Sequence, residues 1–80
     1  MEDKIAVVAI IVKDSESTEK VNSVLHEFRD YVVGRLGIPY KKKNVNVISV
    51  VVDASQETIN GLSGKIGMIE GVTSKVLTTK

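Results

Sequence analysis

Two stretches of this chain are built mainly from β-branched residues, and they limit its fold more than any other feature. One runs from Ile5 to Val12 and the other from Val45 to Val52. Side chains branched at Cβ lose rotamer freedom in a helix but pack well on a pleated sheet, so both stretches predict strands. Both faces of each predicted strand carry apolar residues, which is typical of strands in the middle of a sheet.

Two further segments have the periodicity of amphipathic helices. Apolar residues recur every three or four positions, as they do on one side of a helix. In the first segment these are Val21, Val24, Leu25 and Phe28, and in the second they are Ile59, Leu62 and Ile66. The N-cap candidates are Ser55 for the second helix and, for the first, Asp14, Ser15 and Ser17. Gly67 is expected just beyond the end of the second helix.

Residues 31–38 and 71–80 predict two strands of a different kind. They contain glycine, arginine or lysine among fewer apolar residues, which suits the exposed edges of a sheet. Gly34 and Gly37 weaken the earlier strand and are typical of a bulge or of a close approach to the backbone. Pro39 is expected to end that strand, and the lysines that follow are expected to form the turn.

The resulting order, βαββαβ, predicts an α+β protein with the ferredoxin-like sandwich fold. In this fold a four-stranded antiparallel sheet carries two helices on one face, with the first and third strands in the centre. The apolar pattern agrees, because the two β-branched runs are the first and third predicted strands. We therefore predict a single domain over residues 1–80.

Composition narrows the class of protein. The chain has 80 residues, no cysteine and a formal net charge of +1. It therefore has no disulfide and no thiolate metal site, and it is less basic than most dedicated nucleic-acid modules. The apolar run that starts at Ile5 is too short to cross a membrane, so we expect a cytoplasmic protein with no membrane partner.

The predicted fold leaves one face of the sheet uncovered. The helices shield one face only, although the central strands are apolar on both. Soluble monomers seldom leave an apolar patch on the order of several hundred Å² open to water. We therefore expect a homo-oligomer, a dimer or a tetramer, joined through the open sheet face or through the sheet edges.

The residues offer little support for catalysis or metal binding. His26 is the one histidine, and its helical neighbours Asn22 and Asp30 make a polar strip, which an ordinary solvated position explains. One histidine without cysteine cannot form a transition-metal site within a subunit. Neither a P-loop nor a dinucleotide-binding glycine motif occurs. We expect no catalytic residue, no metal and no cofactor, and hence a protein that is not an enzyme.

Two segments are candidates for binding a small-molecule effector. Effectors of small βαββαβ regulatory domains commonly bind near the loop after the first strand, where Lys13 can contact an acid and Asp14 an amine. Helix capping alone also accounts for this loop. In the second segment, Arg35 offers a planar guanidinium and Tyr40 an amphipathic ring. The predicted ligand-binding residues are Lys13, Asp14, Arg35 and Tyr40.

A nucleic acid is the alternative partner. Lys41, Lys42 and Lys43 are the one concentration of positive charge in the sequence. Together with Arg35 they would make a basic hairpin tip that contacts phosphates, repeated by symmetry in an oligomer. Because a hairpin turn is normally hydrophilic, the lysines also have an explanation without DNA.

Three segments resemble one family. They are GRLGIPY at residues 34–40, VISVVVDAS at residues 47–55 and LSGKIGMIEGV at residues 62–72. They resemble the short proteins described as regulators of an iron-only hydrogenase system, in the same order and over essentially the whole chain. The resemblance implies a fold similar to the ACT domain and to the C-terminal domain of the nickel-responsive repressor. It also implies oligomeric assembly and a regulatory role around hydrogenase maturation.

Two departures from those relatives shape the expected function. The loop KDSESTEK lacks the proline and glycine that are common in ACT domains that bind amino acids. His26 cannot stand for the histidine and cysteine ligands of the nickel repressor. We therefore predict a non-enzymatic, ACT-like regulatory or ligand-sensing module, with a DNA-binding regulator that uses Lys41–Lys43 as the alternative.

Overall fold

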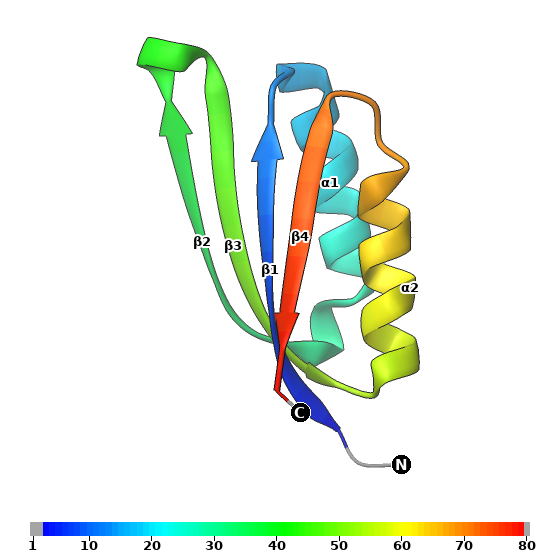
Figure 1. Ribbon diagram of the computed structural model, residues 1–80. Helices are drawn as coiled ribbons and strands as arrows, with labels where there is room; N and C mark the ends of the chain where they lie inside the picture. Colours follow the sequence, from blue (N-terminus) through cyan, green and yellow to red (C-terminus); the bar gives the residue numbers. More distant parts are fainter. Residues whose placement is uncertain (1–2, 80) are drawn as a thin grey trace.

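The computed structural model describes residues 3–79, which form four strands, two helices and two short 3-10 turns (Figure 1). The strands are β1 (Lys4–Val12), β2 (Val32–Tyr40), β3 (Val45–Ala54) and β4 (Val72–Thr78). The helices are α1 (Ser15–Glu27) and α2 (Gln56–Gly67), and the 3-10 turns cover Arg29–Tyr31 and Lys41–Lys43. The predicted order βαββαβ is confirmed.

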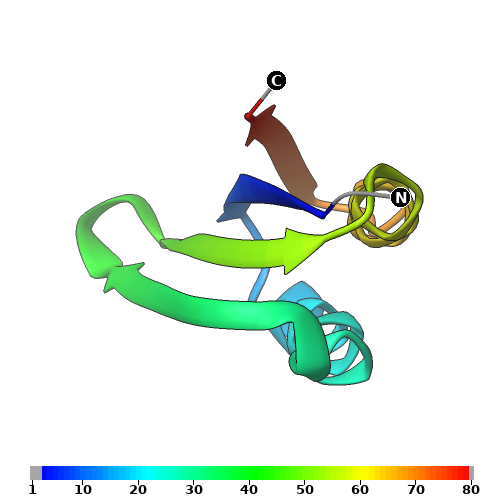
Figure 2. The ribbon, with the colours of Figure 1, turned by 90° about the horizontal axis from the view of Figure 1, so that it is seen from below.

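All four strands lie in one antiparallel sheet with the order β2-β3-β1-β4. The two β-branched runs occupy its centre and the glycine- and lysine-bearing strands its edges, as predicted. Figure 2 shows both helices on the same side of the sheet. The arrangement is the expected α+β ferredoxin-like fold. The two strands that are apolar on both faces lie in its centre, where neighbouring strands flank them on both sides.

The hydrophobic core lies between the sheet and the helices. Alternate residues of the central strands point into it, among them Ile10 of β1 and Ile48 of β3, which are buried. Both predicted helical stripes also face the core. Their buried members are Val21 and Leu25 of α1 and Ile59, Leu62 and Ile66 of α2. The periodic pattern in the sequence therefore identified the correct face of each helix.

Each helix begins at a side-chain cap. The Asp14 carboxylate accepts a hydrogen bond of 3.0 Å from the backbone N–H of Glu16, at the start of α1. The Ser55 hydroxyl accepts one of 3.1 Å from the backbone N–H of Thr58, at the start of α2. Both caps satisfy backbone donors that the helix itself leaves without a partner, and both are among the predicted N-cap residues.

Gly71 is the glycine whose backbone conformation requires that residue type. Its φ is +80°, and a Cβ added to it would lie 3.4 Å from Asp14 Cβ and 3.6 Å from Ser17 Oγ. The sequence predicts that Gly67 is the glycine just beyond the end of the second helix. That prediction is wrong, because Gly67 is the last residue of α2. We expect Gly71→Ala to lower the free energy of unfolding by about 1–2 kcal/mol, as measured by urea denaturation.

Gly64→Ala is the matched control for that substitution. Gly64 lies inside α2, and open space surrounds the position of an added Cβ. Alanine there should raise the free energy of unfolding by about 0.5–1 kcal/mol, because glycine is a poor helix former. Effects of the same sign at Gly64 and Gly71 would contradict this explanation of Gly71.

A bulge decides which side chains of β2 face the helices. Val32 pairs with Val52 but Gly34 pairs with Val51, so one extra residue lies between them, as the glycines predicted. Beyond the bulge, the residues on the helix side are Arg35, Gly37 and Pro39, and those on the other side are Leu36, Ile38 and Tyr40. The strand does not end at Pro39 as expected, because an edge strand tolerates proline.

The face of the sheet away from the helices is exposed and largely apolar. We call it the open face. Its large exposed side chains, between 38% and 73% accessible, are Ile5, Ile11, Leu36, Ile38, Tyr40, Val47 and Leu77. The predicted uncovered apolar face is therefore present.

Candidate functional site

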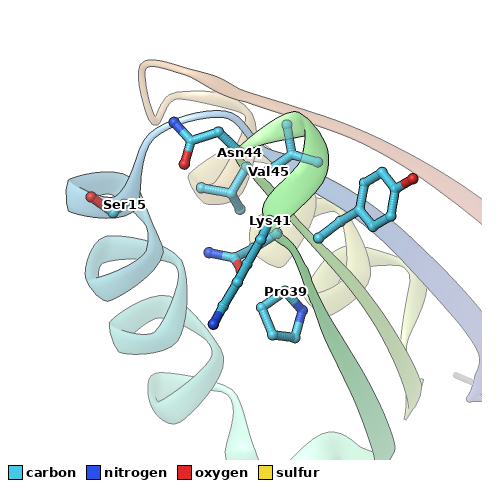
Figure 3. A pocket seen from close by; sticks show the side chains of 8 residues that line it. Ser15, Pro39, Lys41, Asn44 and Val45 are labelled. Carbon is cyan, nitrogen blue, oxygen red and sulfur yellow. The ribbon is translucent and has the colours of Figure 1, made fainter.

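Three cavities adjoin one another between α1 and the β2–β3 hairpin. Their volumes are about 330, 210 and 80 Å³. Asn22 and Arg35 line the first two, and Pro39 and Asn46 line the last two. Because neighbouring cavities share these residues, they form one continuous channel on the surface, which we call the α1–β2 groove. Figure 3 shows its end beside the hairpin turn.

Strand β2 forms one wall of the groove. The bulge turns Arg35, Gly37 and Pro39 toward α1, and all three line the groove. The fold does not need glycine at position 37, because its φ lies outside the left-handed region and open space surrounds an added Cβ. The missing side chain keeps the middle of the groove open. Most of the segment GRLGIPY, which carries the family resemblance, thus lines the groove.

Helix α1 and the turn after it form the opposite wall. The residues that line it are Ser15, Thr18, Asn22, Leu25, His26 and Arg29. All but Leu25 are polar, and the polar residues follow one another at spacings of three or four, so they make one stripe along the helix and the turn. The carboxylates of α1, at Glu16, Glu19 and Glu27, lie outside this stripe. The wall therefore offers hydroxyl, amide and cationic groups without negative charge.

The groove is positively charged. Arg29, Arg35 and Lys41 line it, and among residues 3–79 no aspartate or glutamate does. The one ion pair within that range joins Lys65 to Glu27, and neither residue lines the groove. Since the three cations have no carboxylate partner there, they are available to an acidic ligand.

Two hydrogen bonds hold the middle of the groove in place. Arg35 Nη2 donates to Asn22 Oδ1 at 2.8 Å, which fixes the guanidinium against α1. Asn46 Nδ2 donates to Thr18 Oγ1 at 2.9 Å, from β3 to the same helix. A guanidinium has five N–H donors, so this contact leaves Arg35 further donors for a carboxylate or phosphate.

Lys41 belongs to the groove more than to the hairpin tip. It lines the smallest cavity with Ser15 and Pro39. In Figure 3 its side chain runs back along the hairpin, toward the space beside α1. Lys42 and Lys43 line none of the three cavities and are exposed at the turn. The three consecutive lysines therefore divide into one groove residue and two residues at the tip.

The predicted ligand residues fall in two places. Arg35 lines the groove from the helix side of β2, whereas Tyr40 borders the smallest cavity from a position on the open face. Lys13 and Asp14 line none of its cavities, although their neighbours Val12 and Ser15 line the smallest one. The Lys13 backbone N–H donates to the Gly71 carbonyl at 2.9 Å, so this loop contacts the segment before β4. In the structure, too, the two candidate segments that the sequence indicated lie apart from each other.

Sequence reasoning missed most of the α1 wall. Asn22 and His26 were interpreted as a solvated strip, and Thr18, Arg29 and Asn46 were not considered as ligand residues. The available signal was the stripe of polar residues without carboxylates at helical spacing. It indicates a site only once the strand opposite is known.

The described residues contain no cluster of three or more His, Cys, Asp or Glu side chains that could hold a metal ion. Within residues 3–79, no helix has both the length and the apolar character that crossing a bilayer requires.

Comparison with known proteins gives one family and its fold. Residues 4–76 match the TM1266-like family, described as proposed regulators of the iron-only hydrogenase system. The uncharacterized protein TM1266 from Thermotoga maritima has a similar structure, with a TM-score of 0.94 and 32% sequence identity over 99% of this chain and 100% of that one. No curated protein matches this chain.

A second solved structure shares the fold alone. It is a formyltetrahydrofolate deformylase from Pseudomonas putida KT2440, with a TM-score of 0.66. The identity is 15%, and the match covers 91% of this chain but 28% of the deformylase. This likeness therefore concerns the arrangement of helices and strands and says nothing of activity.

Proposed function

Because the chain belongs to the TM1266-like family of proposed iron-only hydrogenase system regulators, we propose that it is a ligand-sensing regulatory module without enzymatic activity. Its effector is an anionic organic molecule that binds in the α1–β2 groove. The observation that carries this proposal is the charge of the groove: three cationic side chains line it, and no carboxylate among residues 3–79 does.

The lining favours an organic anion over a bare inorganic ion. The half-buried Val32 contributes apolar surface to the largest cavity, beside Arg29 and Arg35, and the buried Leu25 and Val50 lie beneath its floor. Small-molecule sites typically combine apolar walls with a few polar groups that fix the orientation of the ligand. An acidic group can bind Arg35 while an apolar part of the same molecule covers the floor.

The hairpin tip gives weaker support to DNA as the partner. With Lys41 directed toward the groove, Lys42 and Lys43 remain as exposed cations at the turn. Affinity for DNA comes mainly from the number of phosphates that a protein neutralises, and two lysines per copy neutralise few. The experiment must therefore distinguish DNA binding at the hairpin tip from anion binding in the groove.

A titration of the unmodified protein, followed by NMR, tests whether an anion binds in the groove. Pyrophosphate and citrate serve as polyvalent anionic probes, each added to ¹⁵N-labelled protein against sodium chloride of equal ionic strength. We expect the largest chemical-shift changes at Asn22, Arg35 and Gly37, because these residues surround the middle of the groove. Changes confined to Lys42 and Lys43, or no changes beyond those in sodium chloride, would contradict a groove site.

Two charge reversals sharpen the test. Arg35→Glu should weaken binding of either probe by roughly ten- to a hundred-fold, because it removes charge-assisted hydrogen bonds and introduces repulsion. Lys43→Glu changes the net charge by the same amount at the exposed tip and should leave the affinity within about threefold. If a mixed-sequence DNA duplex binds in a salt-sensitive way and Lys43→Glu is the damaging variant, the DNA alternative holds instead.

A further inference from the structure

The open face of the sheet lies on the side away from the helices. Of its large exposed side chains, Ile38 and Tyr40 of the edge strand β2 also border the groove. Its seven large exposed apolar side chains come from all four strands. Side chains of this size and exposure present on the order of 700 Å², close to the area that one partner contributes to a standard stable interface. That is more than the largest apolar patch of a typical monomer, which is about 300–600 Å².

From this surface we infer that the open face packs against the open face of a second copy of the chain. Two identical faces satisfy each other only if they are self-complementary about a two-fold axis. The charges on the face meet that condition. Asp53 of β3 and Lys75 of β4, on either side of β1, are both exposed on it.

The strand register places these two charges symmetrically about Val7. Asp53 pairs with Ile5, two residues before Val7, on the β3 side of β1. Lys75 pairs with Ala9, two residues after Val7, on the β4 side. A two-fold axis over Val7, parallel to the sheet and perpendicular to the line between the two charges, carries Lys75 of one copy onto Asp53 of the other. The dimer then has two ion pairs, one on each side of an apolar centre.

The shape of the open face is also compatible with packing against a second copy. A depression of about 100 Å³ lies beside Ala9 and Ile11, with Thr73, Ser74 and Lys75 completing its lining. Gly34 lies in register with Val51 on the same face, with open space where a Cβ would be. Leu77, which is 73% exposed, projects beside Val7. Hollows next to protruding leucine side chains allow two copies to interlock, as packed sheet faces do.

Sedimentation equilibrium of the parent chain and two matched variants tests the dimer. Leu77→Lys puts a charge beside the centre of the proposed interface and should weaken dimerisation by more than a hundred-fold. Met68→Lys makes the same kind of change at a position that is 86% exposed next to α2, outside the open face. It should leave the dimer dissociation constant unchanged. A monomeric parent at a concentration of about 100 μM, or equal effects of the two variants, would overturn the inference.

A charge swap tests the orientation. Asp53→Lys places two lysines together at each symmetric contact, and Lys75→Asp places two aspartates together. Each should weaken the dimer by about tenfold or more. The double variant with both substitutions should recover most of the parent affinity, because the two ion pairs form again with their charges exchanged. A double variant as weak as the sum of the single effects would overturn the proposed two-fold axis.

Discussion

Replacing Ile10 with alanine should lower the free energy of unfolding by about 2–5 kcal/mol. Ile10 is fully buried on the helix side of β1, in register with Ile48 of β3 and Ser74 of β4. The truncation removes apolar contacts and leaves a cavity that a four-stranded sheet cannot close. A loss of this size is a large part of the total stability of about 5–15 kcal/mol that a small protein has. Urea denaturation measures it.

Ile11→Ala is the matched control for Ile10→Ala. Ile11 is the next residue of the same strand, but its side chain points to the open face, where it is 43% exposed. The same truncation should cost about 1 kcal/mol or less in dilute solution, because little buried contact is lost. Similar losses at both positions would mean that the helices do not cover the face of the sheet described above.

The second large effect concerns the groove. The substitution Gly37→Leu should abolish measurable binding of the anionic probes, because the new side chain projects into the cavity of about 210 Å³ beside Arg35 and obstructs it. The fold should tolerate it, since the φ of Gly37 lies outside the left-handed region and open space surrounds an added Cβ. Replacing glycine within a strand should even stabilise the protein slightly. Binding and stability are therefore expected to change in opposite directions.

Most of the fold could be predicted because its signals are local and repeated. The β-branched runs have apolar residues on both faces, and in the helices apolar residues recur at every third or fourth position. Each element and its buried side can therefore be predicted from residues close together in the sequence. The predictions that were wrong concern the ends of elements. The ends of β2 and α2, near Pro39 and Gly67, depend on the position of the element in the fold, which a local pattern does not contain.

The groove could be predicted only in part, because its lining depends on the register of β2 against β3. Arg35 and Tyr40 stood out by chemistry, whereas Thr18, Asn22 and Asn46 have side chains that any exposed surface can carry. The extra residue of the bulge in β2 determines that Arg35 faces α1. Without it, alternation would put Arg35 on the open face. A sequence with glycines in this strand indicates that a bulge is present, but not which side chains it turns.

Titration of citrate into the Gly37→Leu and Gly34→Leu proteins, followed at the Asn22 side-chain amide, tests the groove most directly. The two variants carry the same substitution on the same strand, in open space in both cases, but on opposite faces of the sheet. If the groove is the anion site, Gly37→Leu shows no saturable shift of this amide, while Gly34→Leu binds like the parent. Equal binding by both variants, or its loss in Gly34→Leu alone, would contradict a ligand site between α1 and β2.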